Sequence, residues 1–149
     1  MSTHQQLFYH VVFSTKNRKP WLTDQFRPKV FAYMAGACEN LGGFALIVNG
    51  YVDHAHLLTR IPAKIAVAEF VGKLKSNTSK HINDTSGLIL KFGWQEGYGV
   101  FSVSRSAKDR VYQYIENQVA HHQHQTFEQE YLQLLDKHEI EYDLKYVFD

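Results

Sequence analysis

The order in which strand-like and helix-like periodicities follow one another is the feature that most restricts the fold of this chain. In residues 4–15, Leu7, Tyr9, Val11 and Phe13 alternate with other residues, which is the period of a strand. Further β-forming runs and helical apolar stripes then follow along the chain. Strands are expected at 44–52, 54–61 and 98–103, and helices at about 23–41, 64–82, 104–122 and 127–138.

This order predicts an α+β fold. Strand, helix, strand, strand, helix and strand in succession are typical of a ferredoxin-like or RRM-like antiparallel sheet with two helices on one face. Thr23 or Asp24 is expected to cap the first helix, and Ser104 or Ser106 the third. The C-terminal helices could pack on the sheet edge, on its other face, or against a partner subunit.

Length and composition indicate one domain spanning residues 1–149. No run of about 18 apolar residues and no signal-peptide pattern is present, so no membrane segment is expected. The single cysteine, Cys38, excludes a disulfide framework and is interpreted as a core residue. This cysteine usage fits a reducing, cytoplasmic setting.

The charge is unevenly distributed although the net charge is only +1. Residues 60–110 carry +5 and residues 111–149 carry −6. A basic middle segment is typical of a local phosphate-binding face, and a mixed solvated surface is the alternative. Eight residues are candidate DNA contacts by charge or by aromatic stacking: Arg60, Lys73, Lys75, Lys80, Lys91, Arg105, Trp94 and Tyr98.

Two histidines alternate within the predicted strand 54–61. Because side chains i and i+2 lie on one face of a strand, His54 and His56 lie side by side and can chelate a divalent metal ion. His-x-His also occurs by chance, so this pair alone does not define a site. Asp53 could orient one imidazole or could simply form the turn.

A tyrosine and a glutamine share one face of the predicted helix 104–122. Tyr114 and Gln118 are separated by four residues, whereas Tyr112 lies about 200° around the helix from Tyr114 and is interpreted as structural. A tyrosine hydroxyl can act as a covalent nucleophile, and a glutamine oxygen can be a neutral metal ligand. A metal ion at the histidines would polarise a phosphodiester for attack by Tyr114.

Ordered segments along nearly the whole chain resemble the single-tyrosine transposases of bacterial insertion sequences, which are small HUH nucleases. The segments that carry the resemblance are LFYHVVFSTKNRKPWL, YVDHAHLLTRIP, KLKSNTSKHIN, FGWQEGYGVFSVSRS, VYQYIENQ and FEQEYLQLLDKHEIEYDLKYVFD. Two positions depart from that family: Ala55, where a bulkier residue is common, and His81, where an aromatic residue is expected.

The resemblance implies a role for each motif residue. His54 and His56 would bind Mg²⁺ or Mn²⁺, Gln118 would complete the metal site, and Tyr114 would be the nucleophile. It also implies binding of DNA hairpins at element ends and cleavage of single-stranded DNA through a 5′-phosphotyrosine. A homodimer is implied as well, in which the tyrosine helix acts within one subunit or between two.

Two other interpretations compete with this one. A catalytically silent or domesticated hairpin-binding module needs no set of four such residues. A small metal hydrolase would use the histidines alone, but no convincing acidic third ligand is expected near them, which weakens this interpretation. The tract of His121, His122 and His124 is interpreted as a frayed helix end rather than a metal site.

Overall fold

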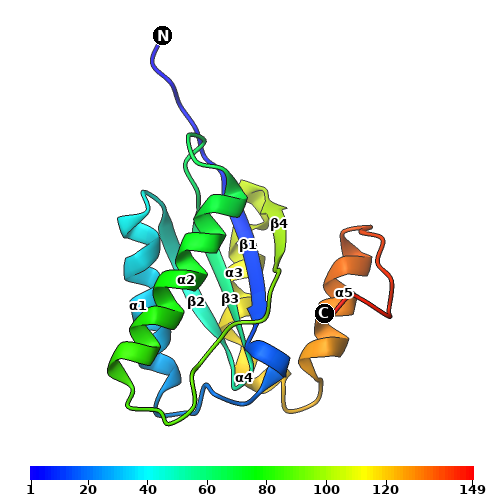
Figure 1. Ribbon diagram of the computed structural model, residues 1–149. Helices are drawn as coiled ribbons and strands as arrows, with labels where there is room; N and C mark the ends of the chain where they lie inside the picture. Colours follow the sequence, from blue (N-terminus) through cyan, green and yellow to red (C-terminus); the bar gives the residue numbers. More distant parts are fainter.

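The computed structural model describes all 149 residues and contains one four-stranded sheet with the order β2-β3-β1-β4 (Figure 1). Every neighbouring pair is antiparallel, and β1 and β3 are the central strands. The expected ferredoxin-like α+β fold is therefore confirmed. The strands are β1 Phe8–Ser14, β2 Phe44–Tyr51, β3 His54–Arg60 and β4 Gly99–Val103.

Helices α1 (Arg27–Asn40) and α2 (Val67–Thr85) cover one face of the sheet, in front of it in Figure 1. The main apolar core lies between them and the strands. It includes Val11, Phe13, Ala55, Leu57, Met34, Phe70 and Leu74, among others. Ala55 thus faces away from the two histidines, and its small size is a matter of packing in this core, as expected.

The C-terminal helices cover the opposite face within the same chain. Helix α3 (Lys108–Glu116) places Ile115 against Phe8 and Leu58, and α5 (Phe127–Lys137) packs on β1 and β4. Helix α4 (Gln118–His121) joins this layer. The C-terminal helices therefore lie on the sheet face opposite α1 and α2, rather than on the sheet edge or against a partner subunit. None of the helices is both long and apolar enough to cross a bilayer.

Several helix boundaries differ from the sequence prediction, and α2 spans Val67–Thr85 instead of 64–82. Helix α1 begins at Arg27 because Asp24 accepts a hydrogen bond from the Arg27 guanidinium at 2.9 Å instead of capping the helix. The predicted helix 104–122 consists of a short 3-10 turn followed by α3 and α4. Asn117 separates these two helices with φ −91° and ψ 17°, outside the helical region.

The close pairing of β2 with β3 gives a stability prediction. A methyl group on Gly50 would lie 2.2 Å from the His54 carbonyl oxygen, whereas one on Gly72 in α2 would meet nothing within 4 Å. We expect Gly50→Ala to lower the free energy of unfolding by about 1–3 kcal/mol. Gly72→Ala should raise it by about 0.5–1 kcal/mol. Urea titrations measure both changes, and equal stabilities would contradict this account of the strand pairing.

Candidate active site

The two histidines of β3 point to the face covered by the C-terminal helices, and both are fully buried. Each imidazole is held at its Nδ1 atom, His54 by Asp53 at 2.7 Å and His56 by His10 at 2.8 Å. The contact with Asp53 is the orienting role considered for that residue. Because the Nδ1 atoms are engaged, both Nε2 atoms are directed into the space beneath α3, α4 and α5.

Tyr114 and Gln118 reach the same space from α3 and α4. The Asn49 side chain of β2 donates hydrogen bonds to the carbonyls of Ile115 and Glu116, at 3.0 and 3.1 Å, which fixes the end of α3 on the sheet. The Gln118 oxygen Oε1 lies 2.9 Å from His54 Nε2. Two residues with i, i+4 spacing therefore converge even though a helix break separates them.

Tyr114 lies beside the histidine pair in the same chain. Its ring centroid is 5.8 Å from that of His56 and 6.0 Å from that of His10. Tyr112 and Tyr114 both pack against the cluster of Phe8, Leu58 and Ile115, but only Tyr114 has ring contacts with His10 and His56. The geometry brings together all four motif residues that the sequence singled out.

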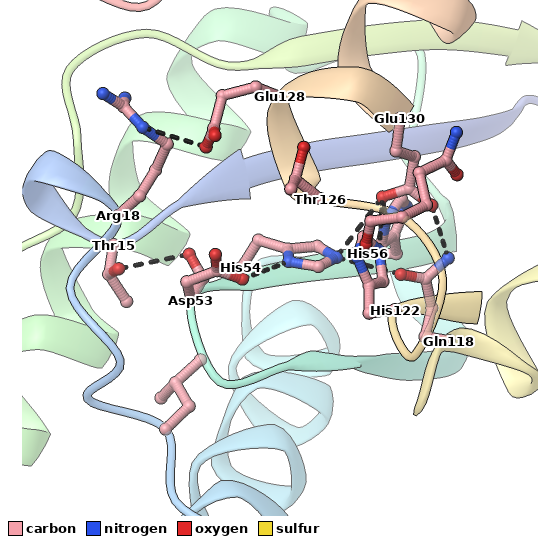
Figure 2. A network of polar contacts seen from close by, with 12 residues as sticks. Thr15, Arg18, Asp53, His54, His56, Gln118, His122, Thr126, Glu128 and Glu130 are labelled. Atoms are coloured by element: carbon pink, nitrogen blue, oxygen red, sulfur yellow. Dashed lines mark hydrogen bonds and ion pairs between the residues drawn. The ribbon is translucent and has the colours of Figure 1, made fainter. Parts of the chain in front are cut away.

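A carboxylate that the sequence argument did not identify lies at the centre of this group. Glu130 of α5 is 1% exposed, and Figure 2 shows it among the histidines and Gln118. Its Oε1 lies 3.0 Å from both His56 Nε2 and His122 Nε2, and 3.4 Å from His54 Nε2. Its Oε2 accepts hydrogen bonds from the Tyr114 hydroxyl and, at 2.8 Å, from the Gln118 amide.

The expectation that no acidic ligand lies near the histidines is therefore wrong. Glu130 is 74 residues from His56 in the sequence, and only the packing of α5 on the sheet brings them together. One signal was available. Glu130 falls between Phe127 and Leu134 on the buried stripe of α5, at a position where an apolar residue would be expected.

The tract of His121, His122 and His124 at the end of α4 was interpreted as a frayed helix end, and this interpretation is wrong for His122. His122 is largely buried, with Nδ1 2.7 Å from the Gln125 carbonyl oxygen and Nε2 on Glu130. His121 packs edge-on against the Tyr114 ring, with centroids 5.0 Å apart. The tract does not form a metal site by itself, but its middle member joins the site built around His54.

The site has strongly unequal proton affinities. Burial by itself lowers the pKa of His54, but hydrogen bonds to Asp53 and Glu130 outweigh burial and raise it to about 9. Burial lowers the pKa of His56 to about 4 despite its contact with Glu130. Burial raises the pKa of Glu130, but hydrogen bonds from His122, His54 and His56 outweigh it and hold that pKa well below its usual range.

The Tyr114 phenol is held in its protonated form. Burial is the largest cause that raises the pKa of Tyr114. The negative charge of Glu130 and the hydrogen bond that the phenol donates to it raise that pKa further. A phenol that keeps its proton is a weak nucleophile. A cation near Glu130 would offset this charge and favour the phenolate.

The donor set fits a divalent cation. Nitrogen and oxygen ligand atoms of His54, His122 and Glu130 lie within 4.8 Å of one another. Imidazole nitrogens together with carboxylate and amide oxygens suit Mn²⁺ and other first-row ions, and oxygen-rich sets suit Mg²⁺. The residues present can therefore hold the metal ion that the sequence motif implies.

The candidate DNA-contact residues do not form one patch. Arg60 and Arg105 lie at the end of the sheet where Phe8, the first residue of β1, pairs with both Arg60 and Val103. Lys91 and Trp94 line a cavity at the opposite end of β1, beside Lys16, Lys19 and Trp21. The remaining candidates are engaged elsewhere: Lys73 with Glu69, Lys80 with Asp84, and Lys75 with the carbonyls of Gln95 and Gly97 near the Tyr98 ring.

Two further residues have structural roles. His81 stacks on Tyr33 with ring centroids 3.9 Å apart and an angle of 8° between the planes, so an imidazole fills the expected aromatic position. Cys38 is fully buried in the main core, and burial raises its thiol pKa to about 12. This agrees with the interpretation of Cys38 as a core residue.

The fold and the arrangement of these side chains define the class of single-tyrosine HUH transposases. A ferredoxin-like sheet carries a His-x-His strand, and two successive helices on its second face carry the tyrosine (α3) and the glutamine (α4). Within that class, the chain belongs to the family described as transposase IS200 like, which matches residues 3–118. Glu130 and the whole of α5 lie beyond the matched segment.

Several known proteins are similar to the chain. The transposases for insertion sequence element IS200 from Salmonella typhimurium and Salmonella typhi are each 31% identical over 117 residues, covering 74% of this chain and 76% of theirs. A putative transposase from Deinococcus radiodurans has a TM-score of 0.62 at 23% identity, over 79% of this chain and 98% of its own. A REP-associated tyrosine transposase bound to a REP hairpin has a TM-score of 0.59 at 15% identity, over 82% and 74%. The last two agree with the fold described above.

The contact between Asp53 and His54 gives a titration prediction. In metal-free protein, we expect His54 to titrate near pH 9, and Asp53→Asn to lower its pKa by about one unit or more, because Asp53 is the largest contribution that raises it. The folded-state pKa lies above the unfolded value of about 6.5, so this group stabilises the fold fully below pH 6.5 and loses its contribution as the pH rises through about 9. Imidazole NMR titration of both proteins tests this, and a native value near 6.5 would refute it.

Proposed function

We propose that this protein cleaves and rejoins single-stranded DNA at the ends of an insertion sequence, with Tyr114 as the nucleophile. The observation that carries the proposal is the convergence of the Tyr114 hydroxyl, the Nε2 atoms of His54 and His56, and the Gln118 side chain in one small space. A module that only binds DNA does not need this arrangement.

Each side chain has a role in this proposal. His54, His56 and Gln118 hold Mg²⁺ or Mn²⁺, which when bound polarises the phosphodiester and offsets negative charge. Tyr114 Oη forms a bond to phosphorus while the bond to the 3′ oxygen breaks, so that the phenol loses its proton and the leaving oxygen gains one. The 5′-phosphotyrosine keeps the bond energy, and a 3′-hydroxyl can later reverse the step to join strands.

A groove beside Tyr114 supports entry of a single strand. A cavity of about 380 Å³ lies between α3 and α5 and is bordered by His10 and Tyr114. Arg110 and Lys137 supply positive charge along its walls, and no acidic residue lines it. Its polar and apolar lining suits phosphates and unstacked bases together.

Other parts of the proposal rest on the family and on the relatives. DNA hairpins are proposed as the recognised structure, since one structural neighbour is described as bound to a REP hairpin. A homodimer and one functional domain over residues 1–149 are also proposed. Because the Tyr114 and histidine side chains meet within one chain, each subunit could carry a complete site.

A covalent-adduct assay tests the nucleophile. Labelled single-stranded element ends and Mn²⁺ should give a protein–DNA adduct on denaturing gels with native protein and with Tyr112→Phe, but none with Tyr114→Phe. Chelation by EDTA should abolish the adduct, and duplex ends should react poorly.

The other outcomes identify the competing functions. DNA retarded on native gels without any adduct would indicate a hairpin-binding module. Cleavage that persists in Tyr114→Phe would indicate a metal hydrolase, an alternative that the presence of Glu130 makes worth testing.

Salt dependence of hairpin binding tests the basic residues. Arg105 and Lys91 have no carboxylate within salt-bridge distance, whereas Lys80 pairs with Asp84 at 2.7 Å. If Arg105 and Lys91 contact DNA phosphates, Arg105→Gln and Lys91→Gln should each reduce the slope of the logarithm of the binding constant against the logarithm of the salt concentration by about 1. Lys80→Gln should change it less. Unchanged slopes in all three variants would exclude these positions from the interface.

A further inference from the structure

The proposed function so far gives no role to Glu130, although it is the most highly connected side chain of the site. It comes from α5, outside the segment 3–118 that matches the family. Its carboxylate is 1% exposed and touches Tyr114, Gln118 and three histidines. Removing a carboxylate from water costs several kcal/mol unless its partners compensate.

Anchoring α5 does not account for this carboxylate. Phe127, Leu134 and Leu135 already fix the helix against Val12 and Phe101 of the sheet. An apolar residue at position 130 would extend that contact without a desolvation cost. A charged residue at this point therefore indicates that its oxygens bind something that an apolar side chain could not.

The hydrogen-bonding partners of the imidazoles indicate what the Glu130 oxygens bind. A carbonyl oxygen only accepts, so His122 Nδ1 donates its proton to Gln125. His54 Nδ1 likewise faces the Asp53 carboxylate. In their neutral forms both rings therefore present an Nε2 lone pair toward Glu130 Oε1, at 3.0 and 3.4 Å.

Lone pairs facing one another repel unless a proton or a cation lies between them. Three adjacent imidazolium ions would repel one another. One divalent cation supplies two positive charges at a single point and uses the lone pairs of several groups at once.

We propose that the C-terminal segment supplies two further ligands to the metal centre, Glu130 and His122, beside the histidines of β3. This inference rests on the proposed function and extends its metal site. The bound ion would tie α5 to the sheet. It would also offset the charge of the carboxylate that accepts the hydrogen bond of the Tyr114 hydroxyl, so that docking of α5 and the surroundings of the nucleophile depend on the same ion.

Titration of full-length, metal-free protein with Mn²⁺ tests the proposal without DNA. Calorimetry or Mn²⁺ electron paramagnetic resonance should show binding weakened by about tenfold or more in Glu130→Gln and in His122→Gln. Glu128→Gln is the matched control, because Glu128 lies on the same helix but is partly exposed and pairs with Arg18 at 3.1 Å. Its affinity should stay within about twofold of native.

Two further measurements exclude trivial explanations. Glu130→Asp keeps a carboxylate and should bind Mn²⁺ more tightly than Glu130→Gln, even if both variants are less stable. Hydrogen exchange of the α5 amides should slow when Mn²⁺ is added to native protein, but not to Glu130→Gln.

The outcomes separate this inference from the proposed function. If Glu130→Gln binds Mn²⁺ as tightly as native protein while His54→Ala does not bind it, Glu130 is not a ligand and the inference fails. The loss of the adduct in Tyr114→Phe would be unaffected by that result. A native protein that forms no adduct would overturn the proposed function even if Glu130→Gln weakens metal binding.

Discussion

The antiparallel pairing of β1 with β3 is the constraint on which both the fold and the site depend. These central strands are buried on both faces, so each residue must suit one of two interiors. Val11 and Ala55 face the apolar core under α1 and α2, whereas His10 and His56 face the polar interior under the C-terminal helices. Because side chains alternate, a slip of one residue would place the histidines in the apolar core and the apolar residues in the site.

The second interior is costly to build and is stabilised by mutual hydrogen bonding. Every buried nitrogen and oxygen of the site lies against a polar partner: Asp53 and His10 contact the outer histidine nitrogens, and Glu130 contacts the inner ones. Such a network gives a single arrangement rather than a large gain in stability, because its desolvation cost offsets much of its attraction. This rigidity is useful where a nucleophile and metal ligands must be held in register.

The C-terminal segment forms part of the site, although the family relationship is carried by residues 3–118. Helix α5 starts with a capping box between Thr126 and Gln129, which determines where the helix begins, and its apolar residues Phe127, Leu134 and Leu135 determine which face meets the sheet. The helix that closes the site therefore also brings its only buried carboxylate.

Local pattern was enough to predict the order of strands and helices, the pairing of His54 with His56, and the shared face of Tyr114 and Gln118. These features depend on the periodicity of strands and helices, which can be recognised from a few consecutive residues. The break at Asn117, the burial of His122 and the position of Glu130 were not predictable in this way. They depend on contacts between segments far apart in the chain, such as Asn49 with the end of α3 and α5 with β1. The sequence by itself determined which chemistry the chain could perform, and the tertiary structure decided which groups surround it, because only packing brings a residue of the last helix to a strand 74 positions away.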